Sequence, residues 1–367
     1  MDSVESRLAR VRGRTMPRRY DARTISALTA NPGCARRALM DAAGIDKQKL
    51  AAHTGYPAPF GQSEFAITRG NAFEAQIKDN GAAQLLTLLR EVLALDVTEA
   101  HYTDLNEVGG NADNELRHVY TKQRLTAPPG HRGTMFDHPL LRFTVAGRHA
   151  YLEPDLIAFQ HRGQFHVIEI KSFAIVDGQA DPAKVAAAAM QSAVYVLALS
   201  DLLGGNGQVH HETILVCPRD FSNEPTAAKI DVRRQLTVIR RQLSRIAHIE
   251  QLLDEYPDDL TFDLDPDEHQ RPRRPAEELA SAIRQVGASY DPQCLSTCEL
   301  CYLCRDEAQG TTGALGKAVR ADLGGIEYTR QALDLARGAV PTADREEAAV
   351  MLLQAAQLRE QILGETV

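Results

Sequence analysis

The sequence predicts an α/β fold in which a central sheet is flanked by helices and helical segments lie toward both ends of the chain. Two apolar runs, residues 152–159 and 165–170, flank a short polar connection that contains Gly163, which is the pattern of a β-hairpin. Apolar residues recur at helical spacing through residues 62–95 and 183–203. Four cysteines within eleven residues mark a separate segment late in the chain.

The predicted hairpin brings carboxylates and a lysine together. Side chains alternate between the faces of a strand, so Glu169 and Lys171 share one face with Val167. Asp155 lies near the start of the first strand, where hairpin pairing can bring it alongside Glu169. Desolvated charges are costly unless they are paired or bound to a metal. The residues alone leave two interpretations open, a surface hairpin with an ion pair and a functional carboxylate centre.

The composition is that of a globular protein. The 367 residues are 44% apolar, with a net charge of −8. We expect a cytoplasmic protein without membrane contact, because no apolar run reaches the roughly 18 residues of a membrane span and the start lacks a signal-peptide pattern. Residues 7–23 carry seven arginines against one acid, Asp21. Such a run is equally consistent with a solvated arm and with a phosphate-contacting segment.

We expect four parts along the chain. They are a basic helical segment with Cys34 (1–60), a core with the sheet (61–225), a helical segment with the cysteine cluster (226–310) and a helical tail (311–367). A strand at 140–145 would join the hairpin in a meander, another strand covers 213–216, and residues 96–135 show little pattern. The later expected helices are 227–253, 276–286, 316–337 and 344–363.

The clustered cysteines indicate metal chemistry. A cytosolic chain rarely uses four cysteines this close together for disulfides, so ligation of zinc or of an iron–sulfur cluster is expected. The four are Cys294, Cys298, Cys301 and Cys304. Taken alone, Cys34 would be a small buried apolar residue.

Four sequence elements, taken in order, resemble the RecB-like branch of the PD-(D/E)XK nucleases. That family has a helix acid or histidine, a (P)D, a (D/E)XK and a Q-x-x-x-Y. The corresponding elements are Glu74 on a helix, Glu153-Pro154-Asp155, Glu169-Ile170-Lys171, and Gln191-x-x-x-Tyr195 on the next helix. The resemblance covers residues 20–306 and implies a restriction-endonuclease-like core, a mixed central sheet flanked by helices.

The resemblance also implies a metal centre. Asp155 and Glu169, with the Ile170 carbonyl, would bind Mg²⁺ or Mn²⁺ through the hard oxygen ligands that these ions prefer. Glu74 would complete the shell at a place where many relatives have histidine. In the same family pattern, Lys171 would orient or help deprotonate the attacking water.

The next helix would contribute to substrate binding. Gln191 and Tyr195 are four residues apart, hence on one helical face, and would position the DNA strand near the metal. We therefore expect a metal-dependent exonuclease that acts on single-stranded DNA or DNA ends. A helicase or another DNA-processing protein is the partner suggested by analogy. A non-catalytic DNA-binding or assembly subunit and a zinc-stapled structural protein are the alternatives.

The segment Cys34-Ala35-Arg36-Arg37 resembles the Cys-Pro-Arg segment of iron–sulfur RecB-like nucleases, with Ala35 in place of proline. That group contains the CRISPR-adaptation nucleases and the AddB nuclease domain. In it, one cysteine before the core and three after it bind a [4Fe–4S] cluster. The resemblance thus implies a cluster that joins the N- and C-terminal helical segments.

The spacing of the later cysteines departs from the C-x2-C-x5-C pattern of the family. Cys298 and Cys304 match its final pair, and Cys294 takes the remaining place with one extra residue. Cys301 is then a spare, although Cys298 and Cys301 can instead form the C-x2-C part. The choice between Cys294 and Cys301 stays open, as does that between an iron–sulfur cluster and zinc.

Overall fold

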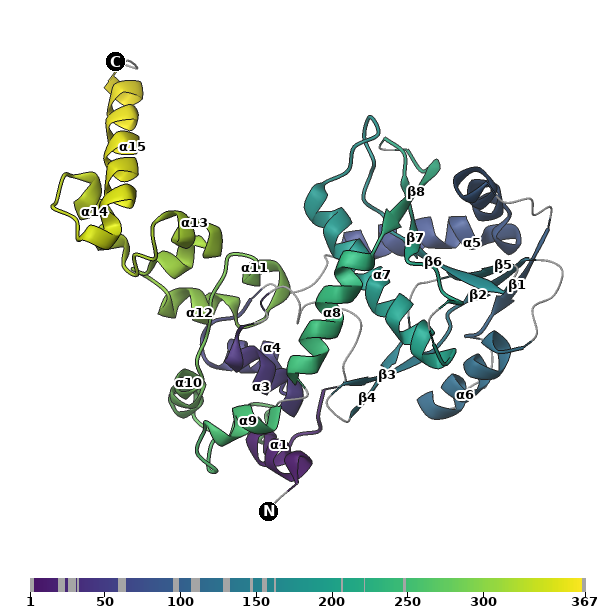
Figure 1. Ribbon diagram of the computed structural model, residues 1–367. Helices are drawn as coiled ribbons and strands as arrows, with labels where there is room; N and C mark the ends of the chain where they lie inside the picture. The colour runs from purple at the N-terminus through teal and green to yellow at the C-terminus, as the bar shows by residue number, and fades with distance from the viewer. Residues whose placement is uncertain are drawn as a thin grey trace. The chain divides into compact units, whose positions relative to one another are not determined.

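The computed structural model describes residues 3–18, 24–25, 31, 33–58, 64–94, 99–106, 113–127, 133–145, 148–153, 157–161, 163–205, 207–220, 222–246 and 249–364. The chain forms two compact units (Figure 1). The sheet unit comprises Arg18–Thr29 and Gly61–Gln251, and the helical unit comprises Met1–Pro17, Ala30–Phe60 and Leu252–Val367. The sheet unit is thus inserted between stretches of the helical unit.

A mixed six-stranded sheet forms the centre of the sheet unit, in the order β1-β2-β5-β6-β7-β8. Its strands are β1 (Ala100–Asp104), β2 (Gly133–Asp137), β5 (Ile157–His161), β6 (Gln164–Ile170), β7 (Glu212–Pro218) and β8 (Pro225–Asp231). The pairs β1/β2 and β6/β7 are parallel, and the other neighbours are antiparallel. The predicted α/β class and the hairpin are confirmed, with Gly163 at a positive φ of 77° between β5 and β6.

Helices cover both faces of this sheet (Figure 1). On one face, α5 (Glu64–Leu93) packs through Phe73, Ile77 and Leu85 against Ile168 and Ile170 of β6. On the other face, α7 (Pro182–Leu202) packs against β6 residues such as Val167, and α8 (Arg233–Ile246) packs on α7. The α6 helix (Asn114–Leu125) also joins the core on the α7 side. The two faces of β6 therefore belong to two different apolar clusters.

Local sequence explains how the covering helices begin and bend. Asp181 caps α7 by accepting hydrogen bonds from the Ala183 and Lys184 amides, and Pro182 occupies the first turn, where its missing N–H costs no hydrogen bond. α5 is interrupted at Asp79–Ala82, where Gly81 adopts a φ of 64° that costs glycine little. The helix predicted over residues 62–95 therefore contains a kink.

The α7 helix is unusually apolar. By length and composition an 18-residue window of it could cross a membrane, although Gln191 and Ser192 interrupt its apolar run. However, 61% of that window is buried inside the structure. A helix packed between a sheet and a second helix is apolar on most of its surface, which accounts for this composition.

Two predictions about the strands are wrong, and two strands come from a stretch for which no structure was predicted. β3 (Leu141–Val145) pairs with β4 (Arg148–Leu152) in a separate two-stranded sheet, so no meander forms with the hairpin. Residues 96–135, which carry no clear pattern, contribute β1 and β2. Residues 225–231, at the expected start of a helix, form β8 instead, because pairing with β7 overrides the helix preference of Ala227 and Ala228.

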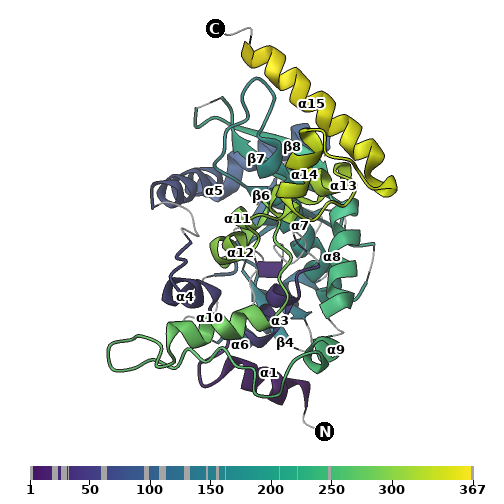
Figure 2. The same ribbon diagram turned by 90° about the vertical axis from the view of Figure 1, so that its left-hand side faces the viewer.

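The helical unit gathers short helices from both ends of the chain. They are α1 (Val4–Arg12), α3 (Ala35–Ala43), α4 (Lys47–His53), α10 (Ala276–Gln285), α11 (Cys294–Thr297), α12 (Cys301–Glu307), α13 (Lys317–Asp322), α14 (Thr329–Ala336) and α15 (Glu346–Gly364). The chain enters this part through α9 (Ile249–Asp254). α14 and α15 pack together (Figure 2). The helix expected over 316–337 is broken between α13 and α14 at Gly324 and Gly325, both with positive φ.

The basic N-terminal segment is partly folded rather than an open arm. α1 includes Arg7, whose guanidinium lies 2.6 Å from the Asp254 carboxylate, and Arg12, which donates to the Ala43 carbonyl at 3.0 Å. Residues 19–23 lie outside the described residues. At least these two arginines of the run therefore hold the helical unit together.

Candidate functional site

Acidic side chains gather at one end of the sheet. Asp104 and Asp137 are register partners at the carboxyl ends of the parallel strands β1 and β2. Asp137 in turn pairs with Ile157, which pairs with Ile168, so Glu169 lies at the same end of the sheet. Ligands of α/β proteins bind at the carboxyl ends of parallel strands. The end of the sheet that carries Asp104, Asp137 and Glu169 is therefore the candidate ligand-binding site.

Glu169 and Lys171 form a close pair at the end of β6. The Glu169 side chain is only 4% exposed, and its carboxylate lies 2.5 Å from Lys171 Nζ. The Lys171 amide donates to the Val216 carbonyl of β7 at 2.9 Å, which fixes the backbone beside the strand end. Because Val167 belongs to the α7 cluster, strand alternation puts Glu169 and Lys171 on the α7 face, as predicted.

Gln191 and Tyr195 lie on that same face. Gln191 Nε2 donates a hydrogen bond to Tyr195 Oη at 3.0 Å, so the two side chains act as one unit on α7. Tyr195 is buried in the cluster that contains Val167. The structure thus puts four of the predicted residues on the α7 side of the sheet. The predicted ligand Asp155 lies outside the described residues.

Glu74 lies on the opposite face. It projects from α5 and forms an ion pair with Lys78, whose Nζ lies 2.7 Å from Asp137 Oδ1. Its Oε1 is also 4.0 Å from His138 Nε2. Glu74 thus contacts the residues around Asp137 on the side of the sheet that α5 covers, whereas strand alternation points Glu169 to the α7 side.

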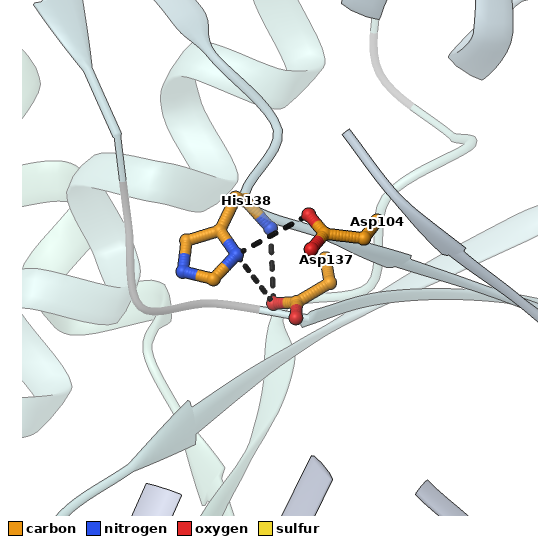
Figure 3. A group of neighbouring side chains, drawn as sticks. All are labelled: Asp104, Asp137 and His138. Carbon is orange, nitrogen blue, oxygen red and sulfur yellow. Dashed lines mark hydrogen bonds and ion pairs between the residues drawn. The ribbon is translucent and has the colours of Figure 1, made fainter. Parts of the chain in front are cut away.

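A second group of possible metal ligands surrounds Asp137. Among the described residues, Asp104, Asp137 and His138 form a set whose ligand atoms all lie within 4.8 Å of one another (Figure 3). His138 Nδ1 lies 3.3 Å from Asp137 Oδ1 and 3.5 Å from Asp104 Oδ1, although neither contact has hydrogen-bond geometry. Two carboxylates and one imidazole suit a divalent transition metal such as Mn²⁺. This acidic group can therefore bind a metal.

The same contacts control protonation. Burial alone would raise the pKa of Asp137, but His138 and Lys78 outweigh it, and the pKa is lowered. The adjacent Asp137 carboxylate raises the pKa of His138. Burial and the hydrogen bond to Asp137 raise the pKa of Tyr102 well above its usual range, so its hydroxyl remains a donor. A proton on His138 and a metal ion are thus alternative partners for the carboxylates.

Sequence reasoning missed this group. Asp137 and His138 follow the apolar pair Met135-Phe136, and a carboxylate and an imidazole directly after a short apolar run were the available signal. Asp104 is 33 positions earlier, and only the parallel pairing of β1 with β2 brings it next to Asp137. The residues around Asp104 and Asp137 contain no local pattern that predicts the pairing of β1 with β2.

The cysteines gather in the helical unit. Cys294, Cys298, Cys301 and Cys304 are buried, and Cys34 is half-buried at the start of α3. Burial raises the pKa of Cys304 to about 12, and the neighbouring Cys298 and Cys34 add to that rise. Burial likewise raises the pKa of Cys301, with Cys294 adding to it. The structure therefore brings Cys34 to the later cysteines, and together they can bind metal.

The sulfur spacing and the surrounding donors distinguish the possible groups. Four sulfurs at about 2.3 Å from a zinc ion would be about 3.8 Å apart. Within the described part of the chain, no three cysteine sulfurs come within 4.8 Å of one another. A [4Fe–4S] cubane holds its four thiolates farther apart, because iron and sulfide ions lie between them. The described sulfurs are therefore not gathered as closely as they would be around a bound zinc ion.

Buried cations line the cysteines. Arg36 Nη1 donates to Cys304 Sγ at 3.2 Å, and Asn31 Nδ2 donates to Cys294 Sγ at 3.4 Å. Lys47 and Arg37 lower the pKa of the Cys298 thiol, although burial has the larger, opposite effect and raises it to about 11. Positive charge and N–H donors around thiolates are what an anionic cluster requires.

Cys217 belongs to neither group. It lies buried in β7 of the sheet unit, in a small cluster with Ala188 and Leu215, where burial raises the pKa of its thiol to about 12. It is a core residue of the sheet unit.

Compared with models of known protein families and with curated proteins, the chain matches none.

Proposed function

We propose that this protein is a metal-dependent DNA nuclease of the PD-(D/E)XK type that carries a [4Fe–4S] cluster. The observation that carries the proposal is the buried Glu169 carboxylate with Lys171 Nζ at 2.5 Å, at the carboxyl end of a central strand. A buried carboxylate and an ammonium group side by side can hold a hard cation and steer a proton at one place. The ordered motifs from Glu74 to Tyr195 add to this support.

Each residue has a distinct role in this proposal. Asp155, Glu169 and the Ile170 carbonyl would hold Mg²⁺ or Mn²⁺, which on binding lowers the pKa of a water ligand and offsets charge on the phosphate. Lys171 orients the attacking water and stabilises the additional negative charge of the transition state. Gln191 and Tyr195, already hydrogen bonded to each other, position the DNA strand on the α7 face.

Glu74 has a different role from the one the family pattern suggests. Its contacts with Lys78 and, at 4.0 Å, with His138 make it part of the group around Asp137. In the proposal Glu74 supports that second group, and Asp104, Asp137 and His138 provide a further place for a divalent ion at the same end of the sheet. Two metal ions near one scissile phosphate are a common arrangement in nucleases.

The cluster would be held by Cys34, Cys298, Cys304 and one of Cys294 and Cys301. Cys34 and Cys298 both raise the pKa of Cys304, which supports these three cysteines as ligands of one cluster. The cluster would join helices from the two ends of the helical unit and so play a structural role. Action on single-stranded DNA or DNA ends, a cytoplasmic location and a helicase or similar partner belong to the same proposal, by analogy with the resembling family.

A specific observation favours the alternative of a non-catalytic DNA-binding or assembly subunit. Lys78 pairs with Glu74 and so already neutralises the helix acid of the family pattern. A nuclease-like fold without a working metal centre would tolerate this arrangement. Such a subunit would bind DNA without cleaving it.

One experiment separates the two functions. Protein purified without oxygen and loaded with cluster is incubated with end-labelled single- and double-stranded DNA and Mn²⁺, alongside Glu169→Gln. The proposal expects progressive shortening of the single strand by the unaltered protein, and loss of that activity with retained DNA binding in E169Q. DNA that stays intact but shifts in a gel would instead establish the binding subunit.

A further inference from the structure

Arg37 presents a buried nitrogen without a partner beside the cysteines. Its side chain is 4% exposed, and Nη1 has no hydrogen-bond acceptor in the described part of the chain. A buried donor of a charged group that lacks an acceptor lowers the stability of the fold. The remaining two nitrogens are engaged, Nε by Asp41 at 3.3 Å and Nη2 by the Thr297 carbonyl at 2.8 Å.

Those two contacts fix where Nη1 lies. The guanidinium is planar and rigid, so a bond from Nη2 to Thr297 holds Nη1 close to the residue just before Cys298. Cys298 itself acts on Arg37. Burial lowers the pKa of the guanidinium, but the charges of Asp41 and Cys298 more than compensate and raise it. The free nitrogen therefore lies in the immediate environment of a predicted cluster ligand.

A charged network holds Arg37 in this place without using Nη1. Asp41 contacts Lys47, and Lys47 Nζ lies 3.3 Å from Glu299. The side chains of Arg37, Asp41 and Lys47 are all nearly buried, so the network cannot relax toward water. Burial of such a network is costly unless its remaining donors are hydrogen bonded, so an acceptor for Nη1 is expected.

The neighbouring Arg36 contacts a different cysteine, Cys304. Its Nη1 lies 3.2 Å from Cys304 Sγ and 2.7 Å from Glu307 Oε2, so this donor is satisfied without any added group. The neighbouring arginines thus differ in one respect. Nη1 of Arg36 already has two acceptors, whereas Nη1 of Arg37 has none among the described residues.

We propose that Arg37 donates this N–H to a sulfur atom of the iron–sulfur cluster and thereby retains the cluster and raises its reduction potential. The inference rests on the proposed function, because it requires the cluster. Hydrogen bonds to cluster sulfurs favour the more negative, reduced state and so raise the potential. Arg37 is a positioning and tuning residue here, since it contacts neither DNA nor the reacting atoms.

The test compares full-length protein with Arg37→Gln and Arg37→Lys, each loaded without oxygen. Arg330→Gln, an exposed arginine on α14, is the matched control. The readouts are the iron content, the rate at which a chelator removes iron, and the midpoint potential from an EPR-monitored titration. None of these depends on nuclease activity.

We expect R37Q to lose iron to the chelator about tenfold faster or more, because removing a residue that hydrogen bonds to a metal site typically weakens metal binding by that factor. Its reduction potential should be more negative. R37K keeps the charge beside Asp41 but lacks the several N–H donors of the guanidinium, so its reduction potential should be intermediate. R330Q should match the unaltered protein. Asp41 retains Lys47 in both variants, which preserves the fold of α3. Circular dichroism checks that fold.

The failures are distinguishable. An unaltered protein with a full iron content, together with unchanged iron retention and potential in both Arg37 variants, overturns the role of Arg37 and leaves the nuclease proposal standing. An unaltered protein that takes up no iron, or takes up zinc instead, removes the cluster and the role of Arg37 together, whatever the nuclease assay shows.

Discussion

Lys78 Nζ lies 2.7 Å from Asp137 Oδ1, so helix α5 supplies a cation to a buried aspartate at the end of β2. The Lys78 side chain is 10% exposed and that of Asp137 only 2%. Breaking a buried pair leaves an uncompensated charge and costs more than the pair contributes. This contact ties α5 to the end of the sheet where Asp104, Asp137 and Glu169 lie.

Lys78→Met should therefore destabilise the sheet unit by about 3 kcal/mol, the lower end for a broken buried ion pair, because Asp137 still has Tyr102 and His138 nearby. Hydrogen exchange in peptides that cover β1 and β2 measures this local effect. Lys78→Met with Asp137→Asn should recover part of the loss. A K78M protein with unchanged exchange would show that the pair contributes nothing to stability.

Mn²⁺ binding near His138 should strengthen as the pH rises. The Asp137 carboxylate raises the pKa of His138 above its ordinary value of 6.5, and the protonated ring cannot be a ligand. EPR titrations with Mn²⁺ below and above the raised pKa measure the change. His138→Gln should remove the pH dependence, and Asp104→Asn should weaken binding about tenfold, which corresponds to about 1.4 kcal/mol.

The same pKa shift has the opposite sign for stability without metal. A histidine whose folded pKa is raised stabilises the fold fully below its unfolded pKa, and this contribution disappears as the pH rises through the folded value. Metal-free protein should thus lose the His138 contribution on going to alkaline pH. Added Mn²⁺ should compensate for it. Equal stability of H138Q and unaltered protein across this range would contradict the assignment.

Lys171→Met should lower the cleavage rate by about 10²–10³-fold, the usual cost of removing one group that stabilises transition-state charge, while DNA binding is retained. Single-turnover cleavage of labelled DNA and a binding titration measure the two effects separately. Lys229→Met is the control, because Lys229 is a half-exposed lysine on β8 whose partner Glu212 is 4.0 Å away. Equal losses of cleavage in both variants would exclude a specific role for Lys171.

His166 should make the fold sensitive to acid. Burial first, and the His210 ring stacked 4.2 Å away, lower the pKa of His166 to about 4. A depressed histidine pKa means that stability is intact above the unfolded pKa of about 6.5 and falls as the pH drops toward 4, by about 3 kcal/mol in total. Urea unfolding at several pH values tests this prediction.

His166→Phe, which keeps an aromatic ring in the stack, should flatten the acid dependence, whereas a change of the exposed His149 to Gln should leave it as it is. The experiment isolates the buried imidazole from the other histidines of the chain. If H166F loses stability with acid as steeply as the unaltered protein, another group causes the effect.

Local patterns were sufficient for the hairpin but not for the whole sheet. The turn at Gly163 and the alternation through Val167 to Lys171 are encoded within a few residues, and the structure bears both out. β1 and β2 have mixed polarity, and their parallel partners are far apart in sequence. Ala227 and Ala228 favour a helix locally, yet the ladder with β7 decides their conformation.

The features of the candidate sites likewise fall into those that local sequence predicts and those that depend on distant segments. The pairing of Gln191 with Tyr195 follows from helical spacing, and a metal-binding role for the clustered cysteines follows from their number and separation. The face that Glu74 occupies depends on how α5 packs on the sheet, which a motif does not specify. The unpartnered nitrogen of Arg37 depends on a fold assembled from distant segments, so no sequence pattern contains it.

The order of the two units along the chain determines which of them is complete first during translation. Residues of the sheet unit end at Gln251, so that unit can fold while the rest of the helical unit is still being made. Arg36 and its acceptor Cys304 are 268 positions apart, and at about 5–20 residues per second the ribosome needs on the order of tens of seconds to join them. The proposed cluster can therefore assemble only after translation has passed its last cysteine ligand, Cys304, whereas the sheet unit is complete in the chain earlier.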